Sequence, residues 1–299
     1  KNPIGIVSLA KNPVNSPQEL VGKTLAEAAL PKMVGISVIG VWERGEFETA
    51  GPQTKITPYT VLVMAGSAEQ FRAYDELFCI YHVNQSPVVI IGGGRVGRAT
   101  GDALLQRKID FRIVERLPER VRRFGERAVI GDASDIDILE KAGIKEAPAV
   151  IITPHDDDTN IYLTIFCRKL RQDIQIISRA VRDRNVSTLH RAGADFVMSY
   201  ASMGANIIFN YLKRSDILMV AEGLNIFKVK LPEELADKSL AEADVRKKTG
   251  CTVIAVQHDG EMQINPDPNA KLEAGEEILL ISDAESETKW FENYAKSRD

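Results

Sequence analysis

The chain lacks the features that define several protein classes. Its three cysteines, Cys79, Cys167 and Cys251, are far apart and have no CxxC spacing. They therefore indicate neither a zinc site nor a disulfide framework, and a reducing compartment fits best. No apolar run approaches the roughly 18 residues of a membrane-spanning helix, and the N-terminus does not have the pattern of a signal peptide. A net charge of −4 gives no support to nucleic acid as the main partner.

The remaining composition is that of a soluble globular protein. Hydrophobic residues make up 44% of the chain and charged residues 27%. A length of 299 residues is enough for two or three domains, each with its own core. The first residue is Lys1 rather than Met, and we expect the chain to be part of a longer protein.

A repeat is the first positive feature. Residues 19–45, "ELVGKTLAEAALPKMVGISVIGVWERG", and residues 234–260, "ELADKSLAEADVRKKTGCTVIAVQHDG", are identical at 13 of 27 positions at a fixed offset of 215. After one extra residue the similarity continues, with "TPYTVLVMAGSAE" matching "EAGEEILLISDAE". The chain therefore carries two copies of one small module.

Each copy predicts a strand, a short helix at KTLAEA or KSLAEA, a hairpin and a closing strand. In the second copy the expected strands are Thr252–Val256 and Glu277–Ile281, with a turn at 258–260. Neither copy holds a matched set of His, Cys and Asp, and structural packing or dimerisation is the simplest role. The copies differ where Trp42 and Glu43 stand against Gln257 and His258.

Between the copies lies a nucleotide-binding pattern. Val88–Ile91 is a continuous apolar run, as expected of a parallel strand buried on both faces. Gly92, Gly94 and Gly97 then form G-x-G-x-x-G at the start of a helix, which allows a tight turn, phosphate approach to the backbone and close helix packing. A second strand, Phe111–Val114, ends in Glu115, 18 residues past Gly97, where a carboxylate can bind both ribose hydroxyls.

This acid favours NAD over NADP, although the neighbouring Arg116 leaves the choice open. Pairing of Glu115 with Arg116 or Arg120 is the structural alternative. The helix that follows the glycines should face the core with Val96, Ala99, Ala103 and Leu104.

The pattern continues as an alternating β/α series, which predicts a doubly wound, Rossmann-like parallel sheet. Gly131, Asp132 and Ala133 should lie in the crevice outside the strand ends, and Asp135 should cap a helix. The further strands are expected at 129–130, 149–153, 174–178 and 196–198.

Two groups of polar residues have competing interpretations. His155 and the run Asp156–Asp158 could hold a divalent cation, but such a run is more often a solvated turn whose last carboxylate caps a helix, here from about Thr159. Arg95 and Arg179 should face the phosphate position, with surface salt bridges as the alternative.

The sequence gives no support to turnover. No Tyr-x-x-x-Lys pair is present, and His82, His155, His190 and His258 are scattered outside any recognisable catalytic context. After about Tyr200 the chain adds only an amphipathic helix, expected to reach about Leu218, and the repeated module.

These segments resemble one family along essentially the whole chain. "VVIIGGGRVGRATGDALL", "GDASDIDILEKAGI", "APAVIITPHDDDTN", "IISRAVRDRNVSTLHRAGADFVMSY" and the KTLAEA/KSLAEA modules are similar to RCK (KTN/TrkA-type) domains, which regulate potassium conductance in prokaryotic channels and transporters. The resemblance implies an α/β Rossmann-like N-lobe flanked by two small α+β C-lobes. The implied limits are 1–82 for a first C-lobe whose own N-lobe is missing, 85–200 for the N-lobe, 201–220 for a crossover helix and 221–299 for a second C-lobe.

The resemblance also implies a function. Such domains bind NAD(H), ADP or ATP without chemistry, pair through the crossover helix, and assemble rings that pull on a potassium pore from the cytoplasmic face of the membrane. Here the crossover helix would contact another subunit, or pack within its own domain, through Met203, Ile207, Ile208, Tyr211 and Leu212. The alternatives are a peripheral Trk-type uptake subunit and, in another class, a small NAD-dependent oxidoreductase.

Residue roles follow from the matched motifs. Some channels of this type respond to Ca²⁺ at acidic inter-lobe sites, for which Asp156 and Asp158 are the candidates. Arg95 is similar to the arginine that discriminates phosphate chains in some members, across a dimer in some cases. The implied phosphate ligands are Gly92, Gly94, Arg95, Gly97 and Arg179, and the implied ribose ligand is Glu115. Asp132 would lie near the adenosine, and Thr153 and Asp156 would line the pocket. The implied nucleotide-binding set also includes Val96, Arg116 and Ala133.

Overall fold

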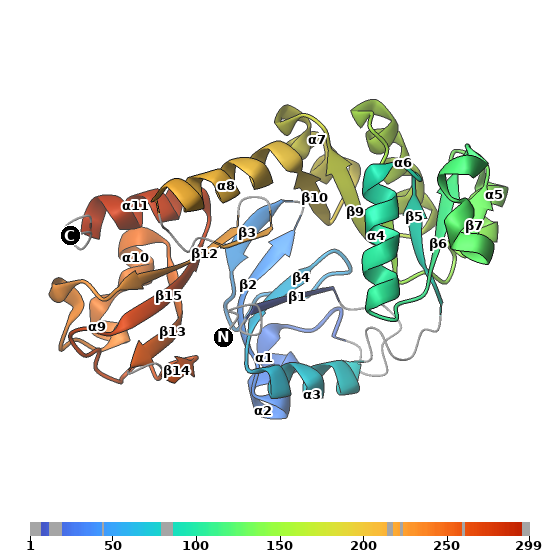
Figure 1. The fold of residues 1–299 in the computed structure, drawn as a ribbon. Coiled ribbons are helices and arrows are strands. Elements are labelled where there is room, and N and C mark those ends of the chain that lie inside the picture. Colours follow the sequence, from blue (N-terminus) through green and yellow to red (C-terminus); the bar gives the residue numbers. More distant parts are fainter. Residues whose placement is uncertain are drawn as a thin grey trace.

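A computed structural model describes residues 7–11, 20–43, 45–78, 86–213, 218–221, 224–258 and 261–294. Cys79, His82 and the 259–260 turn lie outside these residues, as do the side chains of Ile207, Tyr211 and Leu212. The chain forms three β-sheets, with a parallel sheet in the middle of the sequence and a smaller antiparallel sheet on either side of it in sequence (Figure 1). Within the described residues, no helix has both the length and the apolar character needed to cross a bilayer.

The middle sheet is parallel throughout and has the strand order β10-β9-β8-β5-β6-β7. This is the doubly wound order, in which the chain starts in the centre and builds outward in both directions. The predicted Rossmann-like fold is therefore confirmed. Its elements are β5 (Val88–Ile91), α4 (Arg95–Gln106), β6 (Phe111–Glu115), β7 (Ala128–Ile130), α5 (Ile136–Lys141), β8 (Ala149–Ile152), α6 (Asp157–Leu170), β9 (Gln175–Ala180), α7 (Val186–Ala192) and β10 (Phe196–Ser199).

Strand β5 is buried on both faces, as its apolar run predicts. Val89 and Ile91 belong to one core cluster and Val88 and Ile90 to the other, so alternate side chains enter opposite layers. Helix α4 packs against the second cluster through Leu104, as expected, but not through every expected position. Its buried positions are Gly97 and Gly101, whereas Ala99 is exposed toward the nucleotide-type cleft described below.

The two copies of the module fold alike. Each has a short helix that begins with a capping box, in which Thr24 pairs with Glu27 and Ser239 with Glu242. The first copy comprises β1 (Val7–Lys11), α1 (Leu25–Ala28), α2 (Leu30–Val34), β2 (Ser37–Glu43), β3 (Glu46–Thr49), β4 (Val61–Ala65) and α3 (Ala68–Phe78). The second comprises β12 (Leu224–Lys230), α9 (Leu240–Ala243), α10 (Val245–Thr249), β13 (Thr252–His258), β14 (Glu261–Ile264), β15 (Glu277–Ser282) and α11 (Ala284–Tyr294). The closing helices α3 and α11 were not predicted.

Helix α8 (Tyr200–Lys213) runs from the parallel sheet to the second copy (Figure 1). The expectation that this helix reaches Leu218 was wrong, because Leu218–Ala221 form strand β11 and pair antiparallel with β12. On α8, Met203 and Ile208 are 36% and 61% exposed, which shows that they are not core positions of their own domain.

The sheets of the two copies pack against each other. One apolar cluster contains residues of both sheets, and it includes matched positions of the repeat: Ile39 with Ile254, Val63 with Leu279, and Ala65 with Ile281. Asn265 of the second copy also donates its side-chain N–H to the main-chain oxygen of Ala65 at 3.3 Å. The repeat therefore forms a pseudo-symmetric pair within one chain.

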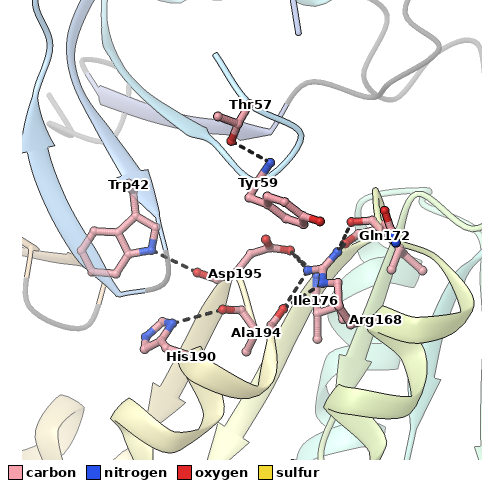
Figure 2. A network of polar contacts seen from close by, with 11 residues as sticks. Trp42, Thr57, Tyr59, Arg168, Gln172, Ile176, His190, Ala194 and Asp195 are labelled. Atoms are coloured by element: carbon pink, nitrogen blue, oxygen red, sulfur yellow. Dashed lines mark hydrogen bonds and ion pairs between the residues drawn. The ribbon is translucent and has the colours of Figure 1, made fainter. Parts of the chain in front are cut away.

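The first copy also docks on the parallel-sheet domain (Figure 2). Trp42 is buried, and its indole Nε1 donates to the main-chain oxygen of Asp195 at 3.0 Å. Arg168 holds the receiving turn, because its guanidinium donates to the main-chain oxygen of Gly193 and to the Asp195 carboxylate, both at 2.8 Å. Trp42 of the first copy corresponds to Gln257 of the second. Among the described residues, this docking contact is made by the first copy and not by the second.

Candidate functional site

A cleft lies at the carboxyl ends of the central strands β5, β6 and β8. The chain winds outward in opposite directions from β5, so the connections after β5 and β8 diverge and leave a crevice at this edge. The cleft has a volume of about 1390 Å³. Typical small-molecule sites occupy about 300–1,000 Å³, so this one has room for a dinucleotide.

The glycine loop forms the floor of the cleft, and each of its positions needs a glycine for a different reason. Gly92 has a φ of 100°, which side-chain-bearing residues rarely adopt. A Cβ on Gly97 would lie 1.8 Å from the main-chain oxygen of Gly92, and a Cβ on Gly93 would lie 2.5 Å from Cγ1 of Val121. A Cβ on Gly94, in contrast, would meet no protein atom within 4 Å, so the space over Gly94 is open to a ligand.

Glu115 lines the cleft and also holds the backbone of the glycine loop. Its carboxylate accepts the backbone N–H of Gly93 at 2.7 Å and that of Leu117 at 3.1 Å. Arg120 approaches it at 3.7 Å, which is the structural alternative that the sequence had left open. A carboxylate offers about four lone-pair positions, so acceptor capacity remains for a ribose hydroxyl. Glu115 therefore ties the glycine loop to β6 and still faces the cleft.

Asp132 and Arg116 form the adjacent wall. The Asp132 carboxylate accepts both the backbone N–H and the hydroxyl of Ser134, at 2.9 and 2.8 Å. These bonds, the backbone one foremost, lower the pKa of Asp132 below its usual value. Arg116 lies 3.5 Å from the other Asp132 oxygen, in an exposed pair of the kind that adds little stability.

The acidic run does not gather around one point. Asp156, not Asp158, caps helix α6 by accepting the N–H and hydroxyl of Thr159, which lowers the pKa of Asp156. Asp157 is buried and accepts the backbone N–H groups of Val181 and Arg182 at 2.7 and 3.0 Å. Asp158 remains exposed on the cleft wall. The described residues contain no cluster of three His, Cys, Asp or Glu side chains that could hold a metal ion.

Cationic side chains face this cleft from two sides. Arg95, the first residue of α4, is exposed and makes no ion pair within the described part of the chain. Arg179, at the end of β9, donates to Nδ1 of His155 at 2.8 Å and lies 5.1 Å from the ring centre of Tyr200. Neither arginine pairs with a carboxylate among the described residues, and such a pair was the structural alternative for both.

The structure brings together the predicted residues, with one exception. Gly97 packs beneath the loop instead of lining the cleft. The Thr153 hydroxyl donates to the main-chain oxygens of Ile91 and Gly92 and so holds the end of β8 against the loop. The lining residues from the predicted set are Gly92, Gly94, Arg95, Val96, Glu115, Arg116, Asp132, Ala133, Thr153, Asp156 and Arg179. The lining residues that our sequence reasoning did not assign to the site include Gly93, Arg98, Ser134, Tyr162 and Tyr200. Only Gly93, inside the GGG run, carried a local signal.

Comparison with known families agrees with this architecture. Residues 88–200 match the TrkA-N domain, and residues 12–78 and 225–291 each match the TrkA-C domain. The chain therefore belongs to the TrkA-N/TrkA-C, or RCK, family of regulatory domains. The double match also confirms the repeat that the sequence predicted.

Individual relatives are potassium channel proteins. The chain is 27% identical over 256 residues to "Probable potassium channel protein 2" of Methanocaldococcus jannaschii, covering 79% of this chain and 74% of that protein. It is 35% identical to the GsuK RCK domain, with a TM-score of 0.53 over 98% of this chain and 64% of that chain. It is 34% identical to a GsuK channel bound to NAD, with a TM-score of 0.52 over 98% of this chain and 53% of that channel chain. The chain thus spans about half to three quarters of these relatives.

Proposed function

We propose that this chain is a ligand-sensing part of a potassium channel's gating ring, which binds a nucleotide at the described cleft without converting it. The open space over Gly94 carries this proposal, because it lies where a phosphate would meet the N-terminus of α4. The first turn of a helix has backbone N–H groups without intrahelical partners, and these favour an anion. Arg95 and Arg179 add positive charge on either side.

NAD(H) is the favoured ligand, and ADP or ATP are the alternatives. The cleft volume of about 1390 Å³ suits a dinucleotide, and the remaining lone pairs of Glu115 suit a ribose with two free hydroxyls. The GsuK channel, which is similar over nearly the whole chain, has been solved with NAD. When bound, the nucleotide would lie with its phosphates over Gly94 and its ribose at Glu115, and Asp132 would be near the adenosine.

The ligand would act by shifting a conformational equilibrium. It can do so only to the extent that it binds one arrangement of the ring more tightly than the other. Exposed apolar residues of α8, Met203 and Ile208, are where a second copy of the chain would pack. The channel relatives favour a pore partner over a peripheral Trk-type subunit.

Calorimetric titration with NAD⁺, NADH, ADP and ATP tests the proposal. Arg95→Ala should weaken binding of the preferred nucleotide by tenfold or more, about 1.4 kcal/mol, because a charge-assisted phosphate contact is lost. Arg246→Ala, which removes an exposed arginine of α10 outside the cleft, is the matched control and should bind normally. The nucleotide should be recovered unchanged. Substrate-dependent NADH formation would instead establish an oxidoreductase, and absence of binding by all four would refute nucleotide sensing.

A further inference from the structure

His155 and Arg179 are paired at the edge of the cleft in a way that fixes the charge of the imidazole. Nη2 of Arg179 lies 2.8 Å from Nδ1 of His155. A guanidinium can only donate, so Nδ1 must accept and therefore carries no proton. In this arrangement His155 is the neutral tautomer with its proton on Nε2.

The guanidinium of Arg179 is incompletely satisfied where it lies. Its Nε is buried and has no hydrogen-bond partner in the described part of the chain. Its Nη1 reaches the main-chain oxygen of Thr153 only at 3.4 Å, and its other neighbour is the face of Tyr200. An anion that entered the cleft would supply the acceptors that Arg179 lacks.

The charges around the pair come from three further elements. Asp156 is the N-cap of α6 and Asp158 lies on its first turn. Arg95 is the first residue of α4, and Tyr200 begins α8. The pKa of Asp156 is lowered by its hydrogen bonds to Thr159, so Asp156 stays ionised in the range where histidines titrate. Arginine does not lose its proton. His155 is thus the side chain of this group whose Nδ1 can act either as an acceptor or as a donor.

Protonation of His155 has opposite consequences with and without an anion. In the free site, a proton on Nδ1 would destroy the hydrogen bond from Arg179 and set two cations side by side, which disfavours the charged imidazole. A phosphate oxygen between them would accept from both Arg179 and Nδ1–H, which favours the charged form. The cleft therefore couples an incoming anion to an incoming proton.

We propose that His155 and Arg179 form a proton-linked phosphate subsite, in which His155 takes up a proton as a nucleotide phosphate binds. This inference rests on the proposed nucleotide-sensing function and adds a regulation to it. The bound state holds more protons than the free state, so affinity must rise as pH falls, by up to about tenfold per pH unit. The ring would then respond to acidification at constant nucleotide concentration.

The test uses NAD⁺, because its diphosphate diester does not titrate near neutral pH. Its affinity for the chain is measured by calorimetry between about pH 5.5 and pH 8, in pairs of buffers that differ in ionisation enthalpy. The dependence of the observed heat on the buffer gives the number of protons taken up. His155→Gln keeps an oxygen that can accept from Arg179 but cannot be protonated. His258→Gln is the control, because His258 is an exposed histidine beside Glu273 and Glu276 in the second copy.

We expect the wild-type chain and His258→Gln to take up a proton on binding and to bind several-fold more tightly at the acidic end. His155→Gln should bind with no proton uptake and a nearly flat pH profile. Binding without proton uptake in the wild-type chain, or uptake that persists in His155→Gln, would overturn the subsite while leaving nucleotide sensing intact. Failure of NAD⁺, NADH, ADP and ATP alike to bind at every pH would overturn both.

Discussion

The glycine loop is proposed to leave room for a phosphate and also lets α4 pack closely against β5. Substituting alanine at Gly94 or at Gly97 should separate these two roles. Gly94 caps α4 in an extended conformation, with φ of −68°, and its Cβ would have no protein atom within 4 Å. Alanine is a poorer N-cap than glycine by roughly 0.5–1 kcal/mol, and it reduces the entropy of the unfolded chain by a similar 0.4–1 kcal/mol. These effects nearly cancel, so Gly94→Ala should leave the free energy of unfolding almost unchanged.

Gly97→Ala should behave differently. Alanine inside a helix is favoured over glycine by about 1 kcal/mol. That gain is outweighed, because the new Cβ would stand 1.8 Å from the main-chain oxygen of Gly92 and 2.9 Å from the Thr153 hydroxyl. Relief requires α4 to move away from β5 as a body, and overpacking of this kind costs about 1–3 kcal/mol or more. Because the clash is with a main-chain atom, the overpacking cost should lie in the upper part of this range. The net loss should then be about 1–2 kcal/mol, or roughly 2–8 °C in the unfolding midpoint.

Both variants should bind NAD⁺ poorly, but for different reasons. In Gly94→Ala the methyl group would occupy the space proposed for phosphate. The affinity for NAD⁺ should fall at least tenfold, although the protein remains stable. In Gly97→Ala the loop itself is displaced. Scanning calorimetry and NAD⁺ titration on the two purified variants separate these effects. Wild-type affinity in Gly94→Ala would refute the placement of phosphate over Gly94, and wild-type stability in Gly97→Ala would refute the packing argument.

Three further predictions concern buried groups. Trp42→Phe should remove the indole donor from the Asp195 carbonyl at a cost of about 1–3 kcal/mol and should speed hydrogen exchange at 193–196. Trp290→Phe, in the core of the second copy, should not change exchange there. Burial lowers the pKa of His190 below its ordinary 6.5, so the unfolded chain binds more protons than the folded one as pH falls through that value, and stability must drop on acidification. The unfolding midpoint should fall less between pH 7.5 and 5.5 in His190→Gln, and equal falls in both proteins would contradict this reasoning. Burial raises the pKa of the Cys167 thiol to about 12, so native protein at pH 8 should resist alkylation at Cys167 until it is unfolded, and rapid labelling of the native state, seen by mass spectrometry, would count against the burial.

Local patterns in the sequence were enough to predict most of the helices and strands and the repeated module. The apolar run at Val88–Ile91, the glycine motif and the acid at Glu115 lie within one strand-helix-strand unit, so neighbours in sequence carry most of the information. The capping boxes of α1 and α9 are equally local, because each closes between residues three apart. The α8 boundary failed for the opposite reason, since Leu218–Ala221 become a strand only by pairing with β12.

The roles of individual side chains depended on tertiary structure. The sequence predicts Glu115 as a ribose ligand. Only the fold shows that its carboxylate also accepts the backbone N–H of Gly93, 22 residues away. The pairing of His155 with Arg179 spans 24 residues, and the docking of Trp42 on Asp195 spans 153. Such contacts have no local signal, because they depend on how strands order within a sheet and how the first module packs on the parallel-sheet domain. The Rossmann-like fold and the repeated module could be derived from residue order alone, because their signals are local. Tertiary packing alone decided which polar groups are already satisfied by the protein and which remain free for a ligand.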